Sequence, residues 1–164
     1  MKRFSSPGKV LTLADFTSED VIVPRLAAKD MAGAILELCE AFQRSDERWD
    51  SKKLCHAALE REHQMTTAMA FGAAFPHARS NVCVELQFAL GCTAEPIEWG
   101  PPGSTKVSLV FLNAVPAHEA MGYLKLLSGM ARLGKDPALF ESFKKATTAR
   151  ELMHLLEKVI LKKG

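Results

Sequence analysis

The segment from Val107 to Leu112 limits most strongly what this chain can fold into. It is apolar apart from Ser108, and it lies between the charged Lys106 and the polar Asn113. Strands covered on both faces have nearly continuous apolar runs, whereas strands with one face in water alternate apolar and polar residues. We therefore predict a strand at the centre of a sheet, buried on both faces.

Helical patterns precede this segment in the chain. Apolar residues at helical spacing predict a helix over 29–44, and Asp50 or Ser51 can cap a second helix. The apolar stretch Val21–Val23, followed by Pro24, predicts a short strand before both helices.

Further elements are predicted on either side of the central strand. β-Branched and aromatic residues in Val84–Ala94 favour one or two strand segments. Asp136-Pro137 places a cap and a first-turn proline at the start of one helix, and the capping box Thr148–Glu151 opens the last helix. An apolar stripe predicts a helix over about 118–133, and its members are Ala120, Leu124, Leu127 and Ala131.

Strands and helices therefore interleave along 164 residues, of which 48% are hydrophobic. A domain of this length buries about two-thirds of the surface of its unfolded chain, so one domain accounts for the whole sequence. We predict a single three-layer α/β domain over 11–164, with a central mixed β-sheet flanked by helices. Residues 1–10 contain the breaker cluster Ser5-Ser6-Pro7-Gly8 and are expected to form a flexible tail.

The charge pattern argues against two classes of partner. The 21 basic and 19 acidic residues give a net charge of +2 without a long run of one sign, which disfavours nucleic acid and anionic membranes. No apolar stretch is long enough to span a membrane, so we expect a cytoplasmic protein that is not an integral membrane protein. The four cysteines match no zinc-binding spacing and are expected to be reduced packing residues.

The dipeptide Pro76-His77 is the strongest chemical signal. It closes the short apolar segment Ala73–Phe75, and proline ends a strand, so we predict the imidazole of His77 at a strand end, at the start of a loop. A free imidazole is roughly three-quarters neutral at pH 7 and offers a ring nitrogen as a nucleophile. Taken alone, however, a histidine after proline is more often an ordinary surface residue.

The surrounding sequence resembles the active-site segment of one family. This family is the enzyme IIA domain of the bacterial sugar phosphotransferase system, of the mannitol/fructose type, which includes nitrogen-regulatory paralogues. Its members have Arg-Glu, a glycine-rich tract and an ending of the form apolar-Ala-apolar-Pro-His. Here Arg61 stands sixteen residues before His77, as in the family, and the other matching residues are Thr67, Gly72, Ala74 and Pro76. Tyr123–Ala131 resembles the family's second motif.

The resemblance implies the same fold and a phosphoryl relay. A histidine-containing phosphocarrier protein would donate a phosphoryl group to His77, which would pass it to a IIB domain or hold it as a regulatory signal. As a freestanding chain, it is expected to be closer to the regulatory paralogues than to a transporter subunit. Such a transfer requires no metal and no cofactor. The resemblance gives Arg61 and Tyr123 phosphoryl-stabilising roles and leaves Thr67 and His118 as possible auxiliary residues.

Two departures from the family pattern keep other interpretations open. The glycines expected at Met65, Ala68 and Ala70 are absent, which means either that positive φ is not needed there or that the loop differs. Tyr123 stands where the family has a second active-site histidine, and its phenol can donate a hydrogen bond but carries no positive charge.

These departures favour a rival hypothesis, a degenerate IIA-like regulatory module that binds a partner without chemistry. Arg61 could be an ordinary helix residue paired with a neighbouring glutamate, and Tyr123 could be a partly buried helix residue. A third hypothesis is a metal-dependent hydrolase that uses His63, His77 and His118.

Overall fold

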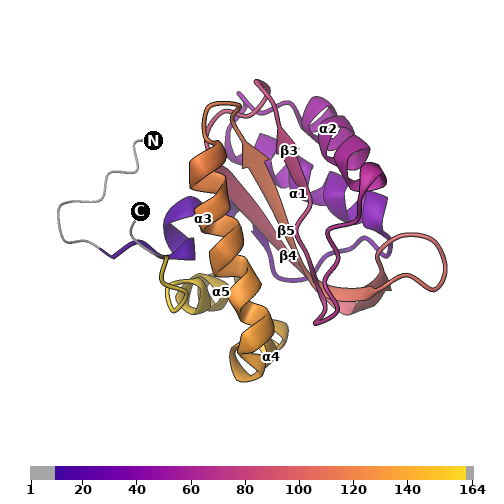
Figure 1. Cartoon of the computed structure of the whole chain (residues 1–164), viewed down its shortest axis with the longest axis vertical. Helices are drawn as coiled ribbons and strands as arrows, with labels where there is room; N and C mark the ends of the chain where they lie inside the picture. The colour runs from indigo at the N-terminus through magenta and orange to yellow at the C-terminus, as the bar shows by residue number, and fades with distance from the viewer. Residues whose placement is uncertain (1–9, 162–164) are drawn as a thin grey trace.

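The computed structural model describes residues 10–161 and places a mixed β-sheet between two layers of helices (Figure 1). This arrangement confirms the predicted three-layer fold. The expected flexible tail, apart from Val10, lies outside the described residues.

The strand predicted from Val107–Leu112 lies inside the sheet as expected. The strands are β1 (Ile22–Val23), β2 (Ala73–Ala74), β3 (His77–Arg79), β4 (Gln87–Glu98) and β5 (Lys106–Val115). The sheet has the order β1-β4-β5-β2, and β3 also pairs with β5. The β4–β5 pair is antiparallel and the other pairs are parallel.

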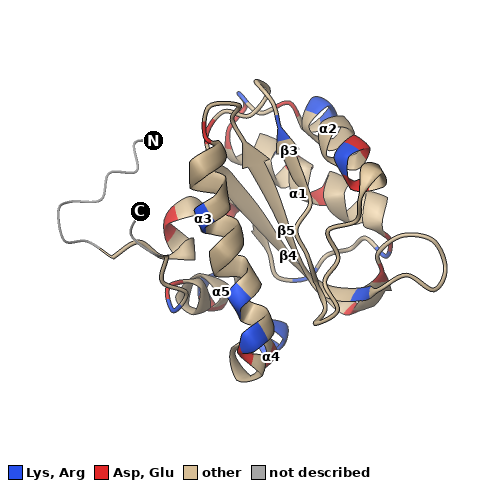
Figure 2. Cartoon of the chain, viewed as in Figure 1, with Lys and Arg blue, Asp and Glu red and all other residues tan. Residues whose placement is uncertain are grey.

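Helices cover both faces of this sheet. They are α1 (Met31–Ser45), α2 (Ser51–Gln64), α3 (Ala120–Ala131), α4 (Pro137–Lys145) and α5 (Ala149–Leu156), with short 3₁₀ turns at Leu13–Phe16, Glu19–Val21 and Arg132–Lys135. Figure 1 shows α3 crossing one face of the β4–β5 pair, with α1 on the far side. Charged residues gather on the helices and loops, while the middle of the sheet is almost free of them (Figure 2).

Alternate residues of β5 enter two separate hydrophobic cores. Leu109, Phe111 and Val115 pack with residues of α3, α4 and α5. Val110 and Leu112 pack with residues of α1 and α2. Side chains alternate between the faces of a strand, so β5 contributes to both cores as its apolar sequence predicts.

Aspartate caps begin several helices where the sequence places them. The carboxylates of Asp50 and Asp136 accept hydrogen bonds from the backbone N–H groups of Lys53 and Leu139. These contacts satisfy donors that have no partner inside the helix.

The predicted capping box at the start of α5 forms only in part. The Thr148 hydroxyl accepts a hydrogen bond from the Glu151 backbone, but the Glu151 carboxylate accepts hydrogen bonds from Thr147 and not from Thr148. The carboxylate of Glu151 therefore binds the residue before the N-cap and not the N-cap residue itself.

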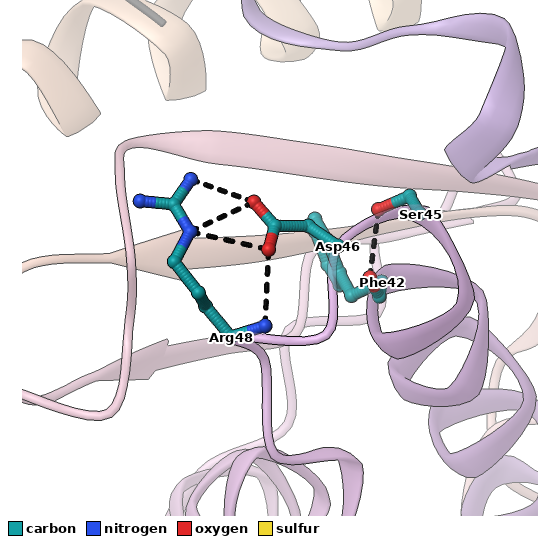
Figure 3. A network of polar contacts seen from close by, with 4 residues as sticks. All are labelled: Phe42, Ser45, Asp46 and Arg48. Atoms are coloured by element: carbon teal, nitrogen blue, oxygen red, sulfur yellow. Dashed lines mark hydrogen bonds and ion pairs between the residues drawn. The ribbon is translucent and has the colours of Figure 1, made fainter.

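The connection between α1 and α2 is held by a local ion pair (Figure 3). The Asp46 carboxylate accepts hydrogen bonds from the guanidinium and the backbone N–H of Arg48, and the Ser45 hydroxyl donates to the Phe42 carbonyl. The hydrogen bonds from Arg48 lower the pKa of Asp46 to about 2. This short closed turn fixes where α2 begins, and α2 carries Arg61 near its other end.

The apolar stripe predicted for α3 is wrong at two of its four residues, although Leu127 packs against the core. Leu124 is 56% exposed and Ala131 is also exposed, whereas the buried residues of the helix are Leu126, Gly129 and Met130. A Cβ at Gly129 would lie 2.6 Å from a methyl group of Leu161, so this glycine lets the helix approach closely on that side. Tyr123 is half-buried and packs against the same core.

The strand expected within Val84–Ala94 is one longer strand, β4, which starts later and extends to Glu98. Its pairing with β5 shifts register between Cys92 and Ile97. Pro96 lies within this shift. Proline has no backbone N–H to donate, and here the regular hydrogen bonds between the two strands are already interrupted.

Candidate active site

His77 begins a strand, which corrects the prediction that it begins a loop. β2 and β3 both pair with β5 in parallel, and Phe75-Pro76 joins them. Pro76 has no N–H to donate, but its carbonyl accepts a hydrogen bond from the backbone N–H of Asn113 at 2.8 Å. The proline therefore interrupts the ladder along β5 without ending it, and His77 is held by strand pairing.

His77 and Arg61 line the same surface depression, which has a volume of about 410 Å³. The residues that line it are Ala57, Glu60, Arg61 and Gln64 from α2 and His77 and Arg79 from β3. Two arginines and one glutamate thus line the same depression as His77. A site with this charge balance favours an anionic group near His77.

Tyr123 approaches the same imidazole from α3. The centroids of the His77 and Tyr123 rings are 5.2 Å apart, and the ring planes meet at 39°. Burial raises the pKa of Tyr123 to about 12, while Arg61 acts in the opposite direction and Glu62 adds to the rise. The phenol therefore stays protonated near neutral pH and keeps an O–H to donate.

The electrostatic surroundings keep His77 neutral. Burial lowers the pKa of the half-buried imidazole, and the nearby charge of Arg61 lowers it further. The backbone of Phe75 and the carboxylate of Glu62 oppose this change. Lowering the pKa below its ordinary value of 6.5 leaves the ring unprotonated at pH 7.

The two ring nitrogens of His77 have different environments. Nδ1 is buried and makes no hydrogen bond with the part of the chain that the structure describes. Nε2 is therefore the ring nitrogen left on the side of the depression. Burial of Nδ1 closes that nitrogen to an incoming electrophile.

Arg61 is held by the end of its own helix. Its guanidinium donates a hydrogen bond to the Met65 carbonyl at 3.3 Å, where α2 ends. The carboxylate of the neighbouring Glu62 accepts hydrogen bonds from Thr67 and Trp99, so Glu62 is not the glutamate that pairs with Arg61.

Glu62 and Thr67 form a buried network behind the site. The Glu62 carboxylate, only 4% exposed, accepts hydrogen bonds from the Trp99 indole N–H at 2.8 Å and from the backbone and hydroxyl of Thr67. The Thr67 hydroxyl in turn accepts a hydrogen bond from the Phe75 backbone N–H at 2.9 Å. Thr67 thus supports the chain that leads into His77 and does not line the depression.

The remaining candidate histidines lie elsewhere. His118 is exposed, with 3.9 Å between its Nε2 and a carboxylate oxygen of Glu119, and it does not line the depression. His63 is exposed on α2. Within residues 10–161, no three histidine, cysteine, aspartate or glutamate side chains are grouped so as to hold a metal ion. The structure therefore does not assemble the three-histidine hydrolase site.

The glycines missing from the family pattern impose no backbone strain. Across the described residues, only glycines have positive φ, so Met65, Ala68 and Ala70 have conformations open to any L-residue. Gly72, the one glycine kept, has φ of +105°, and its carbonyl accepts hydrogen bonds from Ser108 and Leu109 of β5. The retained glycine is the one whose backbone requires it.

Sequence reasoning missed three residues around His77. Arg79 lines the depression and donates a hydrogen bond to the Ala117 carbonyl at 3.2 Å. Glu62 organises the buried network, and Asn113 lies opposite His77 in β5. Arg79 could have been found by treating His77–Arg79 as a strand, because alternate strand residues share a face.

The sequence also matches a family of known proteins. Residues 15–159 match the family described as "Phosphoenolpyruvate-dependent sugar phosphotransferase system, EIIA 2". The chain belongs to this family. The resemblance drawn from Arg61, Pro76 and His77 is therefore confirmed at the level of the family.

Relatives in the family include transport and regulatory proteins. The chain is 26% identical over 150 residues to the PTS system 2-O-alpha-mannosyl-D-glycerate-specific EIIABC component of Escherichia coli, covering 90% of this chain and 23% of that protein. It is 24% identical over 147 residues to the nitrogen regulatory protein of Bradyrhizobium diazoefficiens, covering 89% and 95%. The chain thus spans about a quarter of the first relative and nearly all of the second.

Solved structures of IIA proteins have the same fold. The nitrogen regulatory protein IIA-Ntr of Neisseria meningitidis superposes with a TM-score of 0.73 at 22% identity, covering 88% of this chain and 98% of that chain. Mannitol IIA from the Escherichia coli complex with phosphorylated enzyme IIB gives a TM-score of 0.71 at 17% identity, covering 85% and 95%. In the described part of the chain, no helix is long and apolar enough to span a membrane.

Proposed function

We propose that this IIA domain accepts a phosphoryl group on Nε2 of His77 from a histidine-containing phosphocarrier protein. It then passes the group to a IIB domain or holds it as a regulatory signal. The observation that supports this proposal is a neutral imidazole whose one accessible nitrogen faces a depression lined by Arg61 and Arg79.

The transfer step needs no other reactant. The Nε2 lone pair of His77 forms a bond to phosphorus as the phosphorus–nitrogen bond of the donor phosphohistidine breaks, and that electron pair returns to the donor ring. Arg61 and Arg79 supply guanidinium N–H groups for the phosphoryl oxygens, which carry the charge in the transition state. In-line positioning and these donors supply the catalysis.

Tyr123 contributes a neutral donor to the same group. Its ring lies against His77, and its raised pKa keeps the hydroxyl proton in place. A phenol stabilises a phosphoryl oxygen through one hydrogen bond, whereas a protonated histidine would add a full charge. Arg79 supplies a second positive charge, so the site does not depend on a second histidine.

The downstream partner is proposed from the family. The mannitol IIA structure was solved as a complex with a phosphorylated IIB enzyme, and other relatives are named as regulators. We propose a IIB domain or a regulatory target as the second partner. Since phosphoenolpyruvate is a cytoplasmic metabolite, the reaction would take place in the cytoplasm.

A labelling experiment tests the proposal. The protein is incubated with labelled phosphoenolpyruvate, enzyme I and the phosphocarrier protein, beside a His77→Ala variant and a His118→Ala control. We expect an acid-labile, alkali-stable label on the wild type and on the control, and none on His77→Ala. An unlabelled wild type would favour the degenerate binding module, and a labelled His77→Ala variant would place the acceptor elsewhere.

A further inference from the structure

Asn113 is the buried polar residue nearest to His77 in the strand pairing. It lies in the middle of the sheet, is 0% exposed, and pairs with His77 in the register of β3 on β5. Its neighbours along the strand, Leu112 and Ala114, are buried apolar residues. An amide in such surroundings needs hydrogen-bond partners, so its presence there calls for a reason.

The side chains of Asn113 and His77 lie on the same side of the sheet. Phe111 and Val115, two residues before and after Asn113, face the core formed with α3, and alternation places Asn113 on that side as well. The imidazole of His77 faces Tyr123 of α3. The amide therefore lies beside the imidazole, on the face of the sheet that α3 covers.

Two backbone carbonyls fix the orientation of this amide. The NH₂ group of Asn113 donates hydrogen bonds to the carbonyls of Phe111 at 3.0 Å and Pro76 at 3.5 Å. Carbonyl oxygens only accept hydrogen bonds, so the NH₂ group must be on their side. The amide oxygen Oδ1 consequently points the other way.

That oxygen and His77 Nδ1 are both without partners. In residues 10–161, three buried side-chain atoms make no hydrogen bond, and two of them are Asn113 Oδ1 and His77 Nδ1. Opposing residues on neighbouring strands have Cβ atoms about 5 Å apart, and each orphan atom is attached to the carbon next to Cβ. The two atoms without partners thus belong to side chains that are paired across neighbouring strands.

We propose that Asn113 is a positioning residue for His77, with its amide oxygen accepting a hydrogen bond from Nδ1–H. This contact fixes the tautomer in which Nε2 is unprotonated and its lone pair points into the depression. The partner of a histidine nitrogen decides which nitrogen carries the proton. Asn113 touches neither phosphorus nor donor, and it acts only through the imidazole.

The same contact suits the phosphorylated state. When Nε2 forms its bond to phosphorus, positive charge develops on the ring and the Nδ1 proton becomes more acidic. A neutral amide oxygen accepts this proton more strongly in that state without adding a negative charge next to the phosphoryl group. Asn113 would therefore keep the Nδ1 proton in place in the phosphorylated state as well as orient the nucleophile.

Other groups around the ring set the conditions of the test. Glu60 and Arg61 line the depression from α2, Arg79 lines it from β3, and Tyr123 lies against the ring from α3. The charge of the buried Glu62 also acts on the ring. The backbone carbonyl of Phe75 also lies near the ring and is a competing acceptor for Nδ1–H. A decisive experiment must therefore change Asn113 and leave these groups in place.

Nitrogen NMR of the unphosphorylated protein provides that experiment. The ¹⁵N shifts of the His77 ring report its tautomer and pKa directly, and we expect Nδ1–H in the wild type. Asn113→Leu and the smaller Asn113→Ala remove the acceptor, so the tautomer should shift toward a mixture and the pKa should fall. Asn113→Asp restores an acceptor and adds charge, so Nδ1–H should persist and the pKa should rise.

Thr93→Val is the matched control. Thr93 is another buried polar residue of the sheet, and its hydroxyl donates to the Ser108 carbonyl, away from His77. This variant should leave the His77 signals unchanged. Wild-type shifts in Asn113→Ala, or an Asn113→Asp variant whose His77 pKa does not rise, would overturn the inference.

The purpose assigned to Asn113 rests on the proposed phosphoryl transfer, but the NMR readout does not. If the tautomer responds to Asn113 and the wild type takes no phosphoryl label, the proposed function fails and the contact stands. If the wild type is labelled and the His77 tautomer does not change in the Asn113 variants, the inference about Asn113 fails and the proposed function stands. If both the phosphoryl transfer and the Asn113 contact are confirmed, Asn113→Ala should slow phosphorylation on the order of tenfold to a hundredfold, because the orientation of the nucleophile is lost.

Discussion

The charge of a single imidazole decides whether this site can act. Burial and Arg61 both lower the pKa of His77, so the neutral form persists to lower pH than in a free histidine. Protonation of Nε2 removes the lone pair that would attack phosphorus. The reactivity of the site is therefore governed by the folded-state pKa of one residue.

The first prediction concerns pH. The initial rate of His77 phosphorylation should fall to half of its plateau at a pH below 6.5, the ordinary pKa of a free histidine. Arg61→Gln removes the neighbouring charge, so the pKa of His77 should rise. An NMR titration of both proteins measures the change, with Arg150→Gln on the exposed surface of α5 as the control. A His77 pKa that falls in Arg61→Gln would contradict this electrostatic account.

The second prediction concerns the residue at the position of the missing histidine. Tyr123→Phe keeps the ring against His77 and removes the hydroxyl, so the transfer rate should fall about tenfold or more, as expected for loss of a hydrogen bond to a charged group. Tyr123→His should restore a group able to carry charge and raise the rate again. Quenched-flow transfer from the labelled phosphocarrier protein measures both.

Met121→Ala, on the 74% exposed neighbour of Tyr123 in α3, tests for general damage to the helix. A Tyr123→Phe rate equal to that of the wild type would mean that the hydroxyl does not touch the phosphoryl group.

At the scale of the element, local signals predicted the helices well. The caps at Asp50 and Asp136 and the apolar run of β5 depend on nearest neighbours in sequence, and all three are confirmed. The buried face of α3 could not be predicted in this way. It depends on Gly129 approaching Leu161, a contact between segments that are distant in sequence.

The strand that carries His77 was missed for a similar reason. Pro76 indicates the end of a strand when the sequence is considered alone, and β3 exists because β5 is long enough to pair on both sides of the proline. Arg61 and Tyr123 could be proposed from a family resemblance. Arg79 and Asn113 depend on the position of β3 in the sheet, and the sequence analysis did not find them because it did not predict that strand.

The third prediction concerns the loop between α2 and β2. Thr67→Val removes a hydroxyl that donates to Glu62 and accepts from the Phe75 N–H, so it should lower the free energy of unfolding by about 1–3 kcal/mol. The Phe75 amide should also exchange with deuterium faster. Denaturant unfolding and hydrogen-exchange mass spectrometry measure the two effects.

Thr147→Val provides the comparison, because that threonine is exposed and its hydroxyl donates to the exposed Glu151. A surface change of this kind should alter stability by no more than about 0.5 kcal/mol. Equal effects of the two substitutions would show that the buried network adds nothing specific to the segment before His77.

At the scale of the whole molecule, the site lies where the two helical layers meet. Arg61 comes from α2 on one face of the sheet, Tyr123 comes from α3 on the other face, and His77 comes from the strand between them (Figure 1). The two cores hold these layers in place, and the ring of Tyr123 packs against one of them. A sequence can therefore exchange the second histidine for tyrosine and keep the fold of the family.

The most direct test of the account is the chemical identity of the phosphorylated atom. The ¹⁵N-labelled protein, phosphorylated through the phosphocarrier protein, should show phosphorus coupled to Nε2 of His77 with Nδ1 still protonated. Phosphorus bound to Nδ1, or to any other residue, would contradict the claim that the buried Nδ1 leaves Nε2 as the acceptor.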